Sequence, residues 1–200
     1  MKEDKEDMEN KIKIVLATGN PHKLQEISEI TNGSGIEFVL PSGKFDPIEN
    51  GETFEENSVI KAKEASKISG QIALADDSGL CVEALNGEPG IHSARYDTTP
   101  QRRIDKLLKN LTDTTNRKAK FVCVMTLTDK DGNILHQVKG ECHGQIAKEQ
   151  FGTNGFGYDP VFLVDGYDIT MAQMSEELKN KISHRANALS KMIRFIKENL

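Results

Sequence analysis

Two adjacent carboxylates, Asp76 and Asp77, directly follow the apolar run 72–75 and precede Ser78 and Gly79. Open α/β sheets bind ligands at the carboxyl ends of their strands, and neighbouring carboxylates repel each other unless a cation offsets their charge or their pKa values rise. A magnesium ion would provide that positive charge. The alternative is a solvated turn, because Asp, Ser and Gly are also common in turns. This motif alone leaves both interpretations open.

A lysine, Lys23, lies on the first turn of a predicted helix, directly after the segment Thr-Gly-Asn-Pro-His at 18–22. Helix N-termini disfavour cations because the helix dipole is already positive there. The same conflict occurs at the last predicted helix, which begins with His184 and Arg185 and has Lys179 just upstream. An anionic, acceptor-rich ligand would resolve the conflict at both places. We therefore predict that such a ligand binds at these helix starts.

Two further side chains and a glycine-rich loop fit the same ligand. Glu49 can supply an oxygen to magnesium, which proteins usually hold through one or two carboxylates together with phosphates and waters. Lys61 lies in the middle of a predicted helix, where a solvated surface position is the more common role. The loop 152–157 contains three glycines, which let the backbone approach a ligand, and Phe156 offers a face on which a base can stack. The loop lacks the lysine of a Walker motif, and a tight turn explains it equally well.

The elements that position these residues alternate along the chain. The apolar patterns predict strands at 12–17, 72–75, 121–127, 134–146 and 160–164, and helices at 21–32, 53–69, 100–111, 175–180 and 184–199. Thr53 begins a capping box, Gly70 stops the same helix, and Ser183 is the predicted N-cap of the last helix. The pattern indicates an α/β fold with a mixed sheet.

The length and composition suit one globular domain, which two lobes could share. Of the 200 residues 36% are hydrophobic and 28% charged, which is enough for a sizeable core. Residues 1–10 carry five acids and two lysines and lack the apolar centre of a signal peptide. We predict that they form a disordered extension before a single domain over 11–200. No window approaches 18 apolar residues, so we expect no membrane span.

Charge and cysteine content argue against several other classes of protein. The net charge is −5 and becomes about −2 without the first ten residues, so we expect no broad basic face for nucleic acid. The three cysteines are widely spaced and form no C-x-x-C motif, which indicates neither a disulfide framework nor a zinc site. A reducing, cytoplasmic location fits this pattern.

Five segments, taken together, resemble the inosine triphosphate pyrophosphatase family, which includes the dITP/XTP pyrophosphatases. They are TGNPHK, ENGETFEENSVIKAK, LADDSGLCVEALNGEPGIHSARY, GTNGFGYDP and KISHRANAL, and the resemblance extends from about Ile12 to Ile196. It implies two α/β lobes around a long mixed sheet flanked by helices, an active site in the cleft between the lobes, and a homodimer. It also implies Mg²⁺-dependent hydrolysis of deaminated purine nucleoside triphosphates, namely ITP, dITP and XTP, to the monophosphate and pyrophosphate.

The resemblance also assigns roles to individual residues by motif position. Asp77 would be the catalytic proton acceptor and, together with Glu49, a magnesium ligand. Ser78 would contact the substrate, and Lys61 and Arg95 would neutralise phosphate charge. The triphosphate would be held by Thr18, Gly19, Asn20, Pro21, His22 and Lys23. The base and sugar pocket would comprise Phe156, Gly157, Tyr158, Asp159, Lys179, His184 and Arg185.

The implied mechanism has a simple electrostatic basis. A triphosphate brings roughly four negative charges to a slightly acidic protein, so Lys23, Lys61, Arg95 and the metal must cluster in space. Asp77 would deprotonate a metal-activated water that attacks the α-phosphorus in line. Donors from Arg185 or from backbone N–H groups would favour a carbonyl at the purine six-position over the amino group of adenine.

Two other functions remain open from the sequence. A pyrophosphatase of similar architecture that acts on modified pyrimidine or methylated nucleotides would use the same machinery. A non-catalytic sensor of purine nucleotides would explain the lysines and the glycine-rich loop. The sensor gives no reason for Glu49 and Asp77 both to occupy metal positions.

Overall fold

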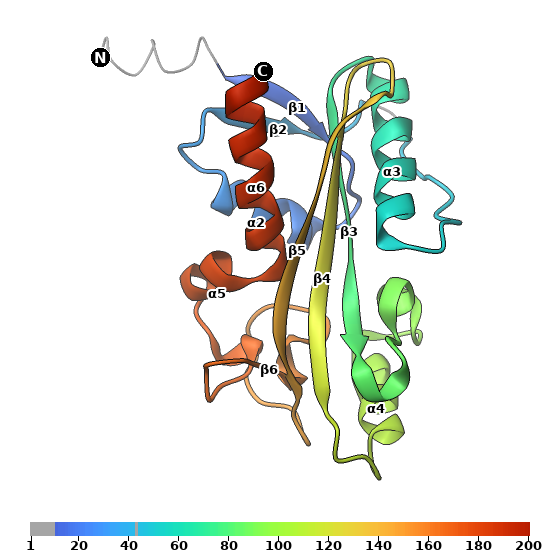
Figure 1. The fold of residues 1–200 in the computed structure, drawn as a ribbon, viewed down its shortest axis with the longest axis vertical. Coiled ribbons are helices and arrows are strands. Elements are labelled where there is room, and N and C mark those ends of the chain that lie inside the picture. The colour runs from blue at the N-terminus through green and yellow to red at the C-terminus, as the bar shows by residue number, and fades with distance from the viewer. Residues whose placement is uncertain (1–10, 43) are drawn as a thin grey trace. The chain divides into compact units, whose positions relative to one another are not determined.

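A six-stranded mixed sheet forms the framework of the protein (Figure 1). The computed structural model describes residues 11–42 and 44–200, and the predicted extension over residues 1–10 lies outside the described residues. The strand order is β2-β1-β3-β4-β5-β6; β1 pairs in parallel with β2 and β3, and β5 pairs antiparallel with β6. The strands are β1 (Ile12–Leu16), β2 (Ile36–Val39), β3 (Ala73–Val82), β4 (Lys118–Thr128), β5 (Ile134–Ile146) and β6 (Phe162–Val164).

Helices alternate with strands from β1 to β4, and two helices follow β6, so the predicted α/β class with a mixed sheet is confirmed. The helices are α2 (Pro21–Ile30), α3 (Phe54–Ser69), α4 (Pro100–Asn110), α5 (Glu176–Ile182) and α6 (His184–Asn199). Four short 3₁₀ segments are η1 (Glu83–Leu85), η2 (Gly90–Arg95), η3 (Asp159–Val161) and η4 (Met171–Gln173). Within the described residues, no helix has both the length and the apolar composition that a membrane span requires.

The chain divides into two compact units. Unit 1 comprises the described residues up to Asp77, together with 124–138 and 188–200, and unit 2 comprises 78–123 and 139–187. Strands β3, β4 and β5 each contribute residues to both units. Each unit has its own core, so each is described separately.

The core of unit 1 is built around small side chains. Ala62 and Ala65 of α3 pack against Ala73 and Ala75 of β3 and against Val15 of β1. These small residues let the helix lie close to the sheet, which brings the polar residues of α3 near β3. Thr53 accepts the N–H of Glu56, and α3 ends at Gly70, which has a φ of +64° that favours glycine. The predicted start and stop of this helix are confirmed, but the capping box is only half formed, because the Glu56 carboxylate accepts the N–H of Glu52 rather than that of Thr53.

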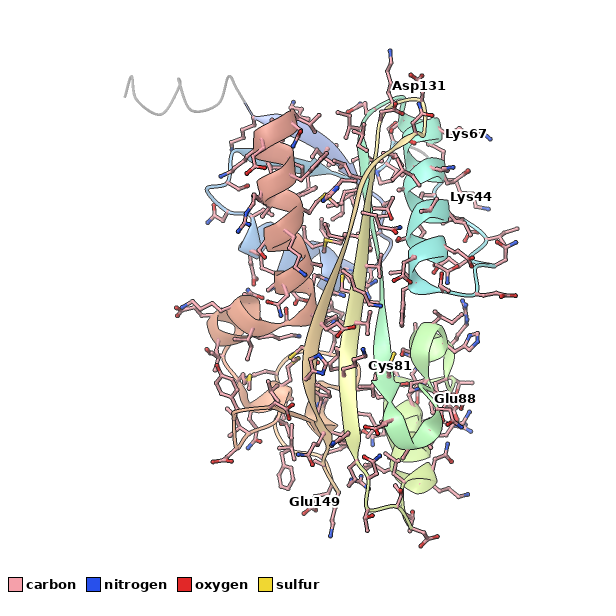
Figure 2. The ribbon with its side chains drawn as sticks, in the orientation of Figure 1. Lys44, Lys67, Cys81, Glu88, Asp131 and Glu149 are labelled. Atoms are coloured by element: carbon pink, nitrogen blue, oxygen red, sulfur yellow. The ribbon has the colours of Figure 1, made fainter. Side chains whose placement is uncertain are left out.

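The core of unit 2 is larger and more apolar. Ile104 and Leu107 of α4 pack with Leu80 and Val82 of β3 and with Phe121 of β4. Over residues 140–146 of β5, buried residues alternate with more exposed ones, as the sequence predicts for a strand with one wet face, whereas none of residues 134–139 is buried. The turn that joins β4 to β5 has Asp131 at its tip (Figure 2) and belongs to unit 1.

Two strands differ from the sequence prediction. The predicted strand 72–75 was expected to end before the two aspartates, but β3 runs through them to Val82, so the solvated-turn interpretation is wrong. Asp76 and Asp77 interrupt the apolar pattern by which a buried strand is predicted. In the structure their charges are neutralised by Lys23 of α2 and Lys61 of α3. Strand β2 is short and largely half-buried, and no alternation in its four residues predicted it.

Candidate active site

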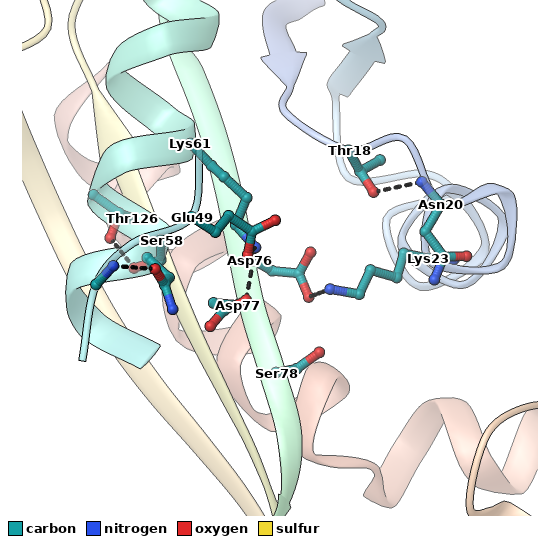
Figure 3. Close-up of polar contacts among 12 residues, drawn as sticks. Thr18, Asn20, Lys23, Glu49, Ser58, Lys61, Asp76, Asp77, Ser78 and Thr126 are labelled. Atoms are coloured by element: carbon teal, nitrogen blue, oxygen red, sulfur yellow. Dashed lines mark hydrogen bonds and ion pairs between the residues drawn. The ribbon is translucent and has the colours of Figure 1, made fainter. Parts of the chain in front are cut away.

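Asp76 and Asp77 are consecutive residues of β3 and therefore point to opposite faces of the sheet. Asp76 Oδ2 lies 2.8 Å from Lys23 Nζ, and Asp77 Oδ1 lies 2.7 Å from Lys61 Nζ. Figure 3 shows Lys23 approaching from α2 and Lys61 approaching from α3 on the other side of the strand. The two aspartate side chains are 1% and 10% exposed. Each buried carboxylate thus has its own lysine.

The turn between β1 and α2 places Lys23. Asn20 caps the helix, because its side chain accepts the N–H groups of His22 and Lys23 at 3.0 and 3.4 Å. Thr18 Oγ1 in turn accepts the Asn20 N–H at 3.1 Å, and Pro21 occupies the first helical position. The protein itself supplies one anion for the lysine at this helix start, namely Asp76, which the sequence analysis assigned no role of its own.

Lys61 connects two of the predicted metal ligands. Its Nζ lies 2.7 Å from Asp77 Oδ1 and 3.2 Å from Glu49 Oε2, and its side chain is only 9% exposed. The interpretation of Lys61 as a solvated surface residue is therefore wrong. Burial opposes its charge, but the carboxylates of Asp76, Asp77 and Glu49 outweigh this, so the pKa of Lys61 is raised.

The carboxyl group of Asp77 has a raised pKa and one oxygen without a hydrogen-bond partner among the described residues. Burial raises the pKa of Asp77, and the nearby Lys61 and Lys23 offset this only in part. Its second oxygen, Oδ2, is buried and accepts no hydrogen bond from any residue that the structure describes. Asp77 therefore holds one oxygen against Lys61 and keeps the other available.

These residues fit a divalent metal ion. The group contains three carboxylates, Glu49, Asp76 and Asp77, and only two ammonium groups, so it has an excess of negative charge. Across residues 11–42 and 44–200, no group of three or more His, Cys, Asp or Glu side chains could hold a metal. Magnesium bound with a phosphorylated substrate needs only one or two protein carboxylates, which Glu49 and Asp77 can provide.

A second group of predicted site residues lies in unit 2, around the ring of Phe156. Lys179 Nζ lies 4.6 Å from the ring centroid and Arg185 Cζ lies 5.9 Å from it. Asp159 Oδ2 accepts both Lys179 Nζ at 2.7 Å and the Phe156 N–H at 2.9 Å. Arg185 is 1% exposed, and its Nη2 donates to Ser78 Oγ at 3.0 Å. The structure brings these five residues together as one group.

The glycine-rich loop that carries Phe156 is tightly constrained. Gly155 has a φ of +72°, and a Cβ at this position would collide with Asp159 Oδ2. Gly152 has a φ of +81°, and its Cβ would collide with the backbone of Ala172. Asn154 Nδ2 also donates to the Met174 carbonyl at 3.0 Å. The glycines therefore let the loop pack against its supporting segments and fix the position of the aromatic ring.

Three other predicted residues have different surroundings. His184 is buried, and its ring stacks on Phe121 with centroids 4.8 Å apart. Tyr158 is also buried, and its hydroxyl donates to the Ser93 carbonyl at 3.0 Å. Arg95 is exposed at the end of η2, and no ion pair or hydrogen bond joins its side chain to any residue in the described ranges. The structure thus adds Arg95 to neither group.

Each of the two groups includes one residue of β3. Asp77, the last residue of unit 1 in this segment, pairs with Lys61, and Ser78, the first residue of unit 2, accepts from Arg185. One group combines ammonium and carboxylate side chains, and the other combines an aromatic ring with two cations. The first suits phosphates and a metal, and the second suits a flat base with acceptor oxygens.

Comparison with known proteins identifies the family of this chain. A model of the Ham1 family matches residues 14–195. A protein named dITP/XTP pyrophosphatase from Nostoc sp. is 43% identical over 180 residues, which cover 90% of this chain and 92% of the relative. A protein of the same name from Staphylococcus aureus is 44% identical over 189 residues, which cover 92% and 95% of the two chains.

Two solved structures also match. A HAM1 protein from Coxiella burnetii has a TM-score of 0.86 and 41% identity, covering 94% of this chain and 99% of the other. The Staphylococcus aureus Ham1 protein has a TM-score of 0.84 and 42% identity, covering 94% and 100%. The protein is thus an α/β protein with the sheet architecture of these structures. The chain belongs to the Ham1 family, and the resemblance found in its sequence motifs is confirmed.

Proposed function

We propose that the protein is a nucleoside triphosphate pyrophosphatase that hydrolyses deaminated purine nucleotides, ITP, dITP and XTP, to the monophosphate and pyrophosphate. The names of its relatives and its membership of the Ham1 family support this activity. The observation that carries it is that the predicted residues form both kinds of group. Glu49, Lys61 and Asp77 of unit 1 suit phosphates and a metal. Phe156, Lys179 and Arg185 of unit 2 suit a flat base. A nucleotide needs both kinds of group.

The phosphate end of the substrate is assigned to the residues of unit 1. Lys23 and Lys61 provide positive charge, and the turn from Thr18 to His22 leads into the start of α2, the positive end of its helix dipole. Arg95 belongs to unit 2, and the family resemblance alone assigns it here as a further cation; it is exposed and has no competing ion pair in the described residues. Because Lys23 and Lys61 are already paired with Asp76, Asp77 and Glu49, the metal is also needed to offset the roughly four negative charges of a triphosphate.

Asp77 is assigned the role of general base. Its unpartnered Oδ2, within the part of the chain that the structure describes, can accept a proton from an attacking water. Glu49 and Asp77 would hold Mg²⁺, which when bound lowers the pKa of water and offsets charge on the phosphates. In-line attack of water on the α-phosphorus releases pyrophosphate as the leaving group, and no covalent intermediate with the protein is needed.

The base end is assigned to the group around Phe156. The ring offers a stacking face, and Lys179 and Arg185 supply donors beside it. Inosine and xanthosine present a carbonyl acceptor at the six-position, whereas adenine presents an amino donor. A buried donor left unpaired costs about 1–3 kcal/mol, which is roughly a five- to 150-fold discrimination per contact. The same donors therefore favour ITP over ATP.

Pyrophosphate release across a panel of nucleotides tests the proposal. We expect release from dITP, ITP and XTP with Mg²⁺, much slower release from ATP, and none after chelation of the metal. Faster release from UTP, dTTP or their modified forms would instead indicate a pyrophosphatase for other nucleotides. Nucleotide binding without release of pyrophosphate under any divalent metal would indicate a sensor.

A further inference from the structure

The predicted metal ligand Glu49 lies on a loop that has no helix or strand of its own, residues 44–52. Its carboxylate nevertheless lies 3.2 Å from Lys61 Nζ. Two hydrogen bonds attach the loop to the first turn of α3. The Gly51 N–H donates to Asn57 Oδ1 at 2.9 Å, and the Glu52 N–H donates to Glu56 Oε2 at 2.7 Å. The position of Glu49 therefore depends on side chains of α3.

Of the two acceptors, Asn57 is the buried one, with 1% exposure. Because the Gly51 N–H can donate only to an oxygen, this contact identifies which end of the amide is Oδ1. The other end, Nδ2, is buried and has no hydrogen-bond partner among residues 11–42 and 44–200. An unsatisfied buried donor disfavours folding. The benefit of an amide at this position therefore comes from its oxygen.

A neutral acceptor suits this place better than a charged one. Asn57 and Lys61 are four residues apart on α3 and so lie on the same face of the helix. Lys61 already pairs with two carboxylates, and a third acid lies close by on β3. An aspartate at 57 would accept the same hydrogen bond but would add charge to a group that already has excess negative charge.

Gly51 fits the contact from the loop side. A Cβ on this residue would lie 2.7 Å from Asn57 Oδ1 and 2.8 Å from the Cβ of Glu56, which is too close for either. The loop thus packs directly on the helix, and only glycine leaves room for this packing. The contact between Gly51 and Asn57 is specific on both sides.

The turn of α3 that carries Asn57 is itself fixed to the sheet of unit 1. Ser58 Oγ and Thr126 Oγ1 of β4 lie 2.6 Å apart in a hydrogen bond, and both residues are fully buried (Figure 3). Gln137 Nε2 of β5 donates to Thr126 Oγ1 at 2.9 Å and to the Glu55 carbonyl at 3.3 Å. A series of hydrogen bonds therefore connects β4 through α3 to the loop.

We propose that Asn57 is a positioning residue, which fixes the loop of Glu49 so that its carboxylate stays beside Asp77 where the divalent metal binds. This inference rests on the proposed function, because the metal is part of that proposal. Asn57 acts through Glu49 and takes no part in the chemistry. Its loss should weaken metal binding rather than abolish nucleotide recognition.

The test compares Asn57→Ala, Gly51→Ala, the double variant and a matched control, Asn50→Ala. Asn50 is an exposed asparagine of the same loop whose side chain makes no hydrogen bond to any described residue. Binding of Mn²⁺ alone is measured by electron paramagnetic resonance, and exchange of the Gly51 amide proton by NMR. We expect about 10- to 100-fold weaker Mn²⁺ binding in both single variants. The amide proton of residue 51, which is glycine in Asn57→Ala and alanine in Gly51→Ala, should exchange faster in both. The double variant should bind Mn²⁺ as tightly as each single variant does, because both substitutions remove the same contact between residues 51 and 57.

Mn²⁺ binding as tight as in the wild type, in an Asn57→Ala protein whose Gly51 amide exchanges faster, would overturn the proposal. Gly51→Ala gives the same test from the loop side if Asn57→Ala does not fold. Neither readout needs turnover. Failure of the wild type to release pyrophosphate from dITP would therefore overturn the proposed function, whereas the Mn²⁺ measurement decides the role of Asn57.

Discussion

Asp76 and Asp77 show how two neighbouring residues of the same type acquire different roles. They point to opposite faces of β3, where each meets one lysine. Asp76 has its carboxylate against Lys23, a predicted phosphate ligand, and so positions that lysine. Asp77 shares its lysine with Glu49 and keeps one oxygen available for chemistry. The direction of the side chain, rather than the residue type, separates the two roles.

Replacement of Asp77 by asparagine tests its role as general base. Asp77→Asn keeps the shape of the side chain but cannot take a proton from water, so we expect kcat for dITP to fall by about 10²- to 10⁴-fold. Binding of dITP, measured by calorimetry, should persist. Asp131→Asn at the exposed tip of the β4–β5 turn is the control and should keep wild-type kcat. Near-normal turnover in Asp77→Asn would exclude this base.

The pH dependence of the reaction follows from the same carboxyl group. Burial raises the pKa of Asp77 above its ordinary value of 3.8. A general base works only when it is ionised, so activity is present above this raised pKa and is lost as the pH falls through it. We expect the acid limb of kcat/KM for dITP to have its midpoint above pH 3.8. The measurement is a pH profile of initial rates, and a midpoint at or below 3.8 would contradict the assignment.

At the scale of elements, the sequence predicted those with clear local signals. The capped ends of α3 and the alternation along β5 are encoded in residue types at fixed spacings, and both are confirmed. The extent of β3 was missed because Asp, Asp, Ser and Gly are typical of turns. Only tertiary partners, Lys23 and Lys61, make a buried strand of these residues possible. Long-range neutralisation of charge has no signature in the local sequence.

The glycine-rich loop gives a test at this scale. In Gly155→Ala the new Cβ combines an unfavourable positive φ with a collision against Asp159 Oδ2, which also holds Lys179. We expect lower stability and a higher KM for dITP. Gly166→Ala is matched for backbone strain, because Gly166 has a φ of +83° but no atom near its Cβ position.

The comparison of Gly155→Ala with Gly166→Ala separates the effect of the collision with Asp159 from the effect of backbone strain. Gly166→Ala should cost about 1–2 kcal/mol in the free energy of unfolding, measured with urea, and leave KM unchanged. Gly155→Ala should cost more and raise KM. Equal effects of both variants would show that backbone strain alone matters and that Asp159 tolerates displacement.

At the scale of the whole molecule, the predicted site residues divide between the two units. Lys23, Glu49 and Lys61 belong to unit 1, and Phe156 and Arg185 belong to unit 2. The motifs predicted both sets and the family, because each motif is local and their order along the chain is distinctive. The placement of both sets in one cleft stays a prediction, as do the cytoplasmic location and the homodimer.

The homodimer can be tested directly. Resemblance to the family implies two chains, so light scattering coupled to size exclusion should give twice the 22.2 kDa of one chain. The expected mass should hold on dilution through the micromolar range, where a weak association would dissociate. A mass of a single chain at all concentrations would contradict the prediction.

Lys61 also acts as an internal counterion. Its ammonium pairs with both Glu49 and Asp77, so these two carboxylates have a positive charge beside them when no metal is bound, and their mutual repulsion is offset. We therefore expect the protein to be folded but inactive when no divalent metal is bound. Chelation of divalent ions should abolish hydrolysis without unfolding the protein, and addition of Mg²⁺ should restore hydrolysis at once.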